Sequence, residues 1–152
     1  MKIRKATIKD ARKIMNLEKE WVEEGISWGV ETTSKKEMIK DLKKGIWYIA
    51  EINGRAVAYA SGQIAKADEG VNWADLRKGQ KYGNIEQIYV KRKYRKRGIG
   101  KKLTQKYLDY FKKEKVKIVK LKAVSKNLRR LIDFYERLGF EEKVCDMIKE
   151  LG

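Results

Sequence analysis

The stretch from Asn84 to Leu103 combines the residue types that bind phosphate groups. It reads NIEQIYVKRKYRKRGIGKKL, in which an apolar strand-like segment runs into a basic turn and then into an amphipathic helix. Gly98 and Gly100 let backbone N–H groups approach a ligand closely, and the start of a helix favours anions. The sequence therefore predicts a phosphate-binding turn between a strand and a helix.

The residues of this turn distinguish between the known phosphate-binding motifs. A Walker loop needs Gly where Arg95 stands and Ser or Thr where Lys102 stands. The dinucleotide pattern G-x-G-x-x-G needs a third glycine where Leu103 stands. The pattern that fits is Gln/Arg-x-x-Gly-x-Gly/Ala, and its six positions are filled by Arg95, Lys96, Arg97, Gly98, Ile99 and Gly100.

A second motif lies downstream, where residues 134–140 read FYERLGF. Gly139 can end a helix there in a left-handed cap. With these two signatures in this order, the chain resembles the GCN5-related N-acetyltransferases. The resemblance implies a single domain over residues 1–152, of α/β (α+β) class, with a mixed, mostly antiparallel sheet flanked by helices.

The resemblance also implies the cosubstrate, acetyl-CoA, and the residues that hold it. The turn would bind the pyrophosphate mainly through backbone amides, and main-chain groups of the preceding strand would pair with the pantetheine arm. This pairing requires a strand edge that is open toward the ligand. The implied cofactor-binding residues are Ile88, Tyr89, Val90, Arg95, Lys96, Arg97, Gly98, Ile99, Gly100, Lys101 and Asn127.

Two catalytic residues follow from the resemblance. Tyr135 matches the tyrosine that protonates the departing thiolate, and phenol and thiol pKa values are close enough for this transfer. Glu86 matches a carboxylate that acts as a base through water. It stands two residues before Ile88, so the two side chains are predicted to share a face. The structural alternatives are a surface carboxylate and a tyrosine packed on the sheet.

Composition limits the other chemistry. The 152 residues include no histidine, which excludes Ser-His and Cys-His catalysis within the chain and the usual zinc clusters, so no metal is expected. Cys145 is the single cysteine and is read as a small buried residue of a late strand. No apolar run reaches the 18 or so residues of a membrane span, and no signal-peptide pattern is present. We expect a cytoplasmic protein with no membrane partner, either a monomer or a homodimer.

The net charge of +17 attracts anions, so nucleic acid stays open as a partner; the alternative is a lysine-rich solvated surface. The rival function is a non-catalytic acyl-CoA sensor or nucleic-acid-binding module on the same fold. One acidic segment stands out, with Glu18, Glu20, Glu23, Glu24 and Glu31. It favours a cationic primary amine as acceptor: a protein N-terminus, a lysine or a small amine. We expect the acceptor pocket or the hydrophobic core to contain Trp21, Trp28 and Trp73.

The expected elements follow the order βααβββαβαβ. Strands are predicted at 2–6, 46–52, 55–64, 83–90, 116–124 and 140–148, and Asn53-Gly54 is a strong hairpin signal. Capping patterns at Thr7 and Ser34 predict helices that end near Gly25 and Lys44. Further helices follow the glycine turn and cover residues 128–138. Residues 65–82 read as a long loop.

Overall fold

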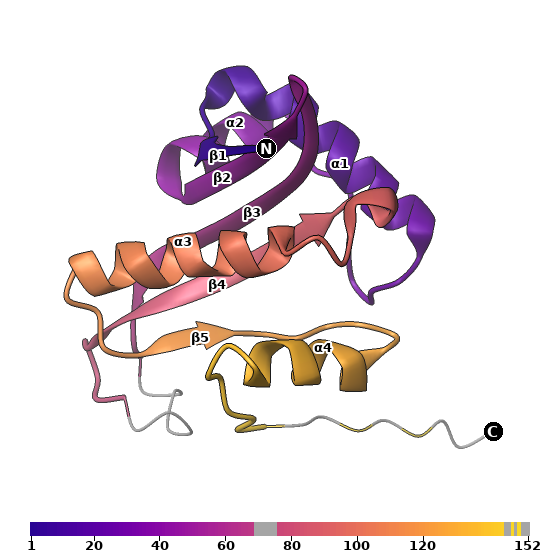
Figure 1. Cartoon of the computed structure of the whole chain (residues 1–152). Coiled ribbons are helices and arrows are strands. Elements are labelled where there is room, and N and C mark those ends of the chain that lie inside the picture. The colour runs from indigo at the N-terminus through magenta and orange to yellow at the C-terminus, as the bar shows by residue number, and fades with distance from the viewer. Residues whose placement is uncertain (69–75, 145–146, 148, 150–152) are drawn as a thin grey trace.

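The computed structural model describes residues 1–68, 76–144, 147 and 149 of the chain. It has one mixed sheet with helices on both faces, which confirms the predicted fold class (Figure 1). The elements are β1 (Lys2–Lys5), a 3-10 turn (Ile8–Asp10), α1 (Ala11–Glu24), α2 (Lys35–Lys44), β2 (Ile46–Ile52), β3 (Arg55–Lys66), β4 (Lys81–Val90), a second 3-10 turn (Arg92–Tyr94), α3 (Ile99–Lys113), β5 (Val119–Leu121) and α4 (Leu128–Glu136).

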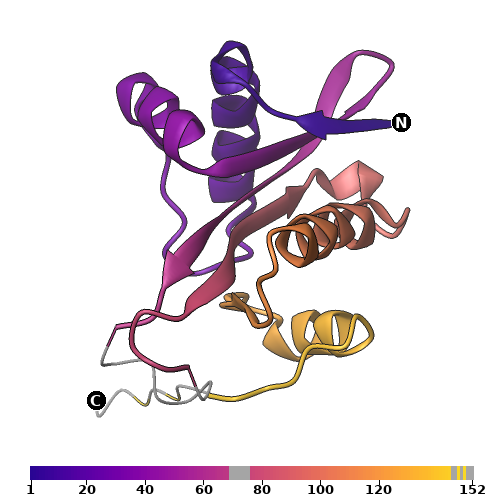
Figure 2. The ribbon, with the colours of Figure 1, turned by 90° about the vertical axis from the view of Figure 1, so that its left-hand side faces the viewer.

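The sheet has the strand order β1-β2-β3-β4-β5 over the described residues. The first four strands are antiparallel, and β5 joins β4 in parallel. Asn53 and Gly54 both have positive φ, as the predicted two-residue hairpin between β2 and β3 requires. Figure 2 shows α1 and α2 on one side of the sheet and α3 on the other.

The helices α1 and α2 begin where the sequence predicts. Both capping boxes form, although the Thr7 box opens the short 3-10 turn that leads into α1. Gly25 ends α1 in a left-handed cap with φ of 59°. The apolar faces of the two helices pack on the sheet around buried residues that include Ile14, Leu17 and Met38.

On the opposite face, α3 lies unusually close to the sheet. A Cβ atom at Gly83 would come within 2.5 Å of the Phe111 ring, and one at Gly62 within 2.8 Å of the Tyr107 ring. Glycine at these two positions therefore permits the close contact. Tyr107 is fully buried, and its hydroxyl donates a hydrogen bond of 2.5 Å to the Ile46 carbonyl.

The main departures from prediction lie toward the C-terminus. Strand β5 covers only Val119–Leu121, because β4 pairs with it over three positions and then diverges. The predicted closing strand is wrong over residues 140–144, which form no strand. The charged run EEKV there offers no apolar face to bury. Cys145 and Trp73 lie outside the described residues. None of the described helices is long and apolar enough to span a membrane.

Candidate active site

The turn between β4 and α3 has the backbone geometry of an anion site. Lys96 and Gly98 both adopt positive φ, of 61° and 74°, and Gly98 is the N-cap of α3. No side chain caps this helix and no acidic residue stands in its first turn. The first intrahelical bond runs from the Lys102 N–H to the Gly98 carbonyl, at 3.0 Å. The N–H groups of residues 99–101 are therefore left for a ligand.

The space in front of this turn suits the predicted cosubstrate. Nothing lies within 4 Å of a Cβ atom built on Gly98, so the backbone is open to an approaching phosphate. Lys96 and Arg97 are exposed beside it, and Lys101 is exposed on the first turn of the helix. The turn therefore fits the pyrophosphate of acetyl-CoA in shape, charge and donor chemistry.

The strand edge that must be open for a pantetheine arm is open. β4 pairs with β5 only from Gly83 to Ile85, and beyond this point Figure 1 shows the two strands diverging. The Lys91 N–H bonds to Val57 on β3. Because bonding direction alternates along a strand, the backbone groups of Ile88 and Val90 face the open edge. Those of Tyr89 face β3, so only two of the three predicted strand residues are placed to pair.

Arg95 occupies a different position from the one expected of a phosphate ligand. Its Nε donates to the Val90 carbonyl at 2.8 Å, and its Nη2 donates to Glu24 at 2.8 Å. The same Glu24 carboxylate accepts a hydrogen bond of 2.5 Å from the Tyr89 hydroxyl. The guanidinium also lies 5.7 Å from the centre of the Tyr89 ring. Arg95 thus ties the end of α1 to the turn and covers one carbonyl of the open edge.

Burial and the Glu24 carboxylate together raise the pKa of the Tyr89 hydroxyl well above its usual range. Sequence reasoning missed the role of Glu24, which lies 71 residues from Arg95 along the chain. No local pattern signals a pairing over that separation. The isolated acidic segment within a basic chain was the only indication.

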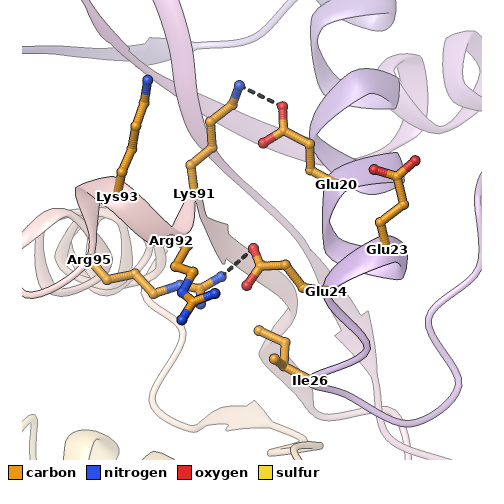
Figure 3. A pocket seen from close by; sticks show the side chains of 8 residues that line it. All are labelled: Glu20, Glu23, Glu24, Ile26, Lys91, Arg92, Lys93 and Arg95. Atoms are coloured by element: carbon orange, nitrogen blue, oxygen red, sulfur yellow. Dashed lines mark hydrogen bonds and ion pairs between the residues drawn. The ribbon is translucent and has the colours of Figure 1, made fainter.

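A groove of about 970 Å³ runs between the end of α1 and the segment after β4 (Figure 3). Carboxylates line one wall and cations line the other, and two ion pairs cross between them: Lys91 with Glu20 at 2.6 Å, and Arg95 with Glu24. The lining residues are Glu20, Glu23, Glu24, Ile26, Lys91, Arg92, Lys93 and Arg95. The groove therefore places charges of both signs beside the turn.

A β-bulge decides the orientation of Glu86. Gln87 pairs with Ser61 and Ile85 pairs with Gly62, so Glu86 is the extra residue. Its carboxylate accepts hydrogen bonds from Gln63 and Asn84.

Those two partners face away from α3, because Asn84 pairs with Gln63 and lies between Gly83 and Ile85, which both face that helix. Ile88, in contrast, packs on the α3 side. The prediction that Glu86 and Ile88 share a face is therefore wrong. Glu86 is exposed on the α1 side of β4.

Tyr135 lies on α4, which packs beside the start of α3. The neighbouring Phe134 ring would touch a Cβ atom at Gly100 at 3.4 Å. The Tyr135 ring meets Phe134 and Phe140 edge to face, at 5.0 and 5.7 Å. Burial raises the pKa of its hydroxyl to about 12. The described residues offer this hydroxyl no hydrogen-bond partner.

The loop between α1 and α2 reaches the loop before α4. The Ile26 carbonyl accepts hydrogen bonds from the Lys126 N–H at 2.9 Å and from the Ser125 hydroxyl at 3.4 Å. The Lys126 ammonium sits 4.9 Å from the centre of the Trp28 ring, which is 66% exposed. Asn127, predicted to contact pantetheine, is exposed at the start of α4 and bonds to Ser125 through its backbone N–H.

Only part of the predicted acidic segment is exposed to solvent. Glu18 is 1% exposed and accepts hydrogen bonds from the Thr33 N–H and hydroxyl, both at 3.1 Å. Its desolvation raises the pKa of the carboxyl group. Glu18 therefore holds the α1–α2 loop rather than facing an acceptor. Trp21 stacks on Tyr89 at 5.4 Å and donates to Ser27, so it belongs to the core.

Comparisons with known proteins agree with this geometry. The model of the acetyltransferase (GNAT) family matches residues 11–140. An uncharacterized N-acetyltransferase of Methanocaldococcus jannaschii is 34% identical over 97 residues, which are 64% of this chain and 39% of that protein. The chain thus spans less than half of that relative's length.

Two solved structures share the fold. One is a variant of the protein BH1408 from Bacillus halodurans, with a TM-score of 0.77, 20% identity and coverage of 99% of this chain and 100% of that one. The other is an aminoglycoside N-acetyltransferase in complex with coenzyme A, with a TM-score of 0.71, 17% identity and 98% coverage of both chains.

Because the family model covers most of its length, the chain belongs to the GNAT family of acetyltransferases. This confirms the family predicted from the two sequence signatures. The family is one of acetyltransferases, and one structural neighbour was solved in complex with coenzyme A.

Proposed function

We propose that the protein transfers the acetyl group of acetyl-CoA to a cationic primary amine by direct attack. The observation that carries the proposal is the open edge of β4, which leads straight into a helix start with free amides. The two features form a continuous track for a ligand that has a diphosphate at one end and a flexible amide-bearing arm at the other.

Along this track, the residues have separate tasks. The N–H groups of Ile99, Gly100 and Lys101 bind the diphosphate, with Lys96 and Arg97 adding charge. The carbonyl of Ile88 and the N–H of Val90 pair with the arm. Arg95 borders the track by covering the Val90 carbonyl. Asn127, exposed at the start of α4, is proposed as a further contact of the arm.

Acetyl-CoA supplies an activated acetyl group as a thioester. The Ile88 N–H, on the open edge, polarises the acyl carbonyl by donating a hydrogen bond to its oxygen. Tyr135 donates its phenolic proton to the leaving sulfur. Since burial keeps its pKa near 12, this hydroxyl remains protonated across the working pH range.

Glu86 removes a proton from the incoming amine through a water molecule. Its exposed carboxylate stands at the bulge, where β4 turns its edge outward. The hydrogen bonds from Gln63 and Asn84 orient the carboxylate without burying it. A water chain fits this exposed position better than direct contact with the amine.

The acceptor is proposed to carry positive charge. Trp28 already holds one ammonium group, that of Lys126, over its exposed ring. Glu23 and Glu31 are exposed in the same part of the chain. One structural neighbour is named for aminoglycosides, which are amine-bearing sugars. A peptide N-terminus, a lysine side chain or a small polyamine each fits this charge.

The test is release of coenzyme A, followed by thiol detection, across a panel of amines. We expect turnover with cationic primary amines and little with neutral or acidic ones. Trp28→Ala should raise KM for the cationic amine several-fold and leave KM for acetyl-CoA unchanged. Acetyl-CoA binding by calorimetry without turnover of any amine would instead favour a non-catalytic acyl-CoA sensor.

A further inference from the structure

The positive charge of this protein is concentrated in one segment. Residues 91–122 contain 15 lysines and arginines and only two acidic residues, which gives this segment +13 of the total +17. The remaining 120 residues carry only +4. A lysine-rich surface that serves solubility alone would spread its charge more evenly. The asymmetry points to an anionic partner of this segment.

Helix α3 displays this charge on one face. Its exposed residues are Lys101, Lys102, Gln105, Lys106, Asp109, Lys112 and Lys113. Helical spacing places all seven within one side, opposite the residues that pack on the sheet. The one acid on this face, Asp109, accepts a hydrogen bond of 2.8 Å from Gln105. None of the five lysines forms an ion pair with a described residue.

This lysine face extends beyond the phosphate turn. The 15 residues of α3 span about 22 Å. The phosphate turn lies only at the N-terminal end of this helix. Lys112 and Lys113 lie at the opposite end of the helix. A groove of about 340 Å³ runs alongside, between the helix and β1, and Lys102 and Lys106 line it. A diphosphate at the helix start leaves this length of the face unused.

We infer that the lysine face of α3 (Lys101, Lys102, Lys106, Lys112 and Lys113) binds the phosphodiester backbone of a nucleic acid. Regularly placed lysines on a rigid helix match a polymer with a charge on every unit. No apolar side chain is exposed on this face. A protein interface needs an apolar centre and disfavours lysine, so an acidic protein fits less well. No aromatic ring is exposed on it either, so the bases have no ring to stack on. The lysines contact phosphates, which carry no base sequence.

The inference is independent of acetyl transfer, and its test avoids the phosphate turn. A 20-base-pair DNA duplex and a single-stranded RNA of 20 nucleotides are each titrated by fluorescence anisotropy at several salt concentrations. The variant combines Lys106→Glu, Lys112→Glu and Lys113→Glu. The matched control combines Lys36→Glu, Lys40→Glu and Lys43→Glu on α2. These are also exposed lysines, and they lie on the other side of the sheet (Figure 2).

We expect the α3 variant to weaken binding at least 10-fold and to reduce the slope of log K against log salt by about 2–3. The control should change affinity less than 2-fold. Whether duplex or single strand binds more tightly identifies the partner. Equal losses in both variants would show that total charge acts alone and would overturn the inference. Complete displacement of the nucleic acid by acetyl-CoA would also overturn it, because the polymer would then occupy only the turn.

Discussion

The two halves of the sheet differ in how far their strands are paired by backbone hydrogen bonds. From β1 to β4 each strand pairs with the next one, and helices lie on both faces (Figure 2). Between β4 and β5 the pairing stops after three positions. Apart from the outer edge of β1, the closed half pairs its backbone internally, while the open half leaves the backbone of Ile88 and Val90 for a ligand. Stability and binding are therefore assigned to different parts of one sheet.

The bulge at Glu86 marks the boundary between the two halves. Before it, β4 contacts both neighbouring strands; after it, only β3. A bulge bends and twists its strand locally, which separates β4 from β5 without disturbing β3. The comparison leads to a general expectation: substitutions in the closed half should change stability, and those along the open edge should change ligand affinity or rate.

The largest effect is expected in the closed half, for Gly83→Ala. The new Cβ would lie within 2.5 Å of the Phe111 ring, so helix α3 must shift from the sheet. We expect unfolding free energy to fall by about 3 kcal/mol, as overpacking does, measured by urea denaturation. Gly83→Ala combined with Phe111→Leu should lose less than the sum of the two single changes. Additive losses would argue against this contact as the cause.

In the open half, Tyr135→Phe removes a proton donor and retains the ring. We expect kcat to fall about 100-fold, which is about 2.7 kcal/mol, with acetyl-CoA affinity unchanged. Because the pKa of Tyr135 is about 12, the wild-type rate should not fall with ionisation of this group below about pH 11. Tyr110→Phe, at the other end of α3, is the control. Unchanged kcat where chemistry limits the rate would remove Tyr135 from the mechanism.

The ion pair of Asp10 with Arg4 makes the stability of the closed half depend on pH. Two hydrogen bonds from Arg4, at 2.7 and 2.8 Å, lower the pKa of this carboxyl to about 2. Because the pKa of Asp10 is lower in the folded than in the unfolded chain, its charged carboxyl stabilises the fold at pH values above the unfolded pKa of about 4. This stabilisation is lost as the pH falls toward 2. We expect Asp10→Asn to cost about 2 kcal/mol at pH 7 and progressively less below pH 4. A pH-independent difference in unfolding free energy would contradict the linkage.

The phosphate turn of the open half can be tested with a pair of glycines. Gly98 and Gly54 both have φ of 74°, and neither has an atom within 4 Å of its Cβ position. Alanine therefore strains both backbones alike, but only Gly98 borders the free amides. We expect Gly98→Ala to weaken acetyl-CoA binding about 10-fold by calorimetry, or about 1.4 kcal/mol, and Gly54→Ala to leave it unchanged. Equal affinities would place the diphosphate elsewhere.

The smallest effect is expected at the boundary, for Glu86→Gln. An exposed carboxylate that acts through water is replaceable by solvent in part, so we expect kcat/KM to fall less than 10-fold at neutral pH. The loss should shrink at high pH, where the amine deprotonates unaided. Glu142→Gln, another exposed carboxylate, is the control. A variant with the wild-type pH profile would show that Glu86 serves only the bulge.

The sequence determined the local features of this protein. Helix starts at Thr7 and Ser34, the Asn53-Gly54 hairpin and the glycine turn each depend on neighbouring residues, and local chemistry suffices to predict them. The two signature motifs were enough to identify the family. The long-range arrangement of β5 and the residues after Phe140 was predicted less well, because strand pairing depends on a partner far along the chain.

Only the tertiary structure decided how the site residues are used. Glu24 meets Arg95 across 71 residues, which turns an expected phosphate ligand into a link between α1 and β4. The bulge is a mismatch between two strands, so no single strand reveals that Glu86 faces away from Ile88. Burial of Glu18 likewise depends on the loop that folds over it. Composition supplied the charges, and packing alone determined which of them meet.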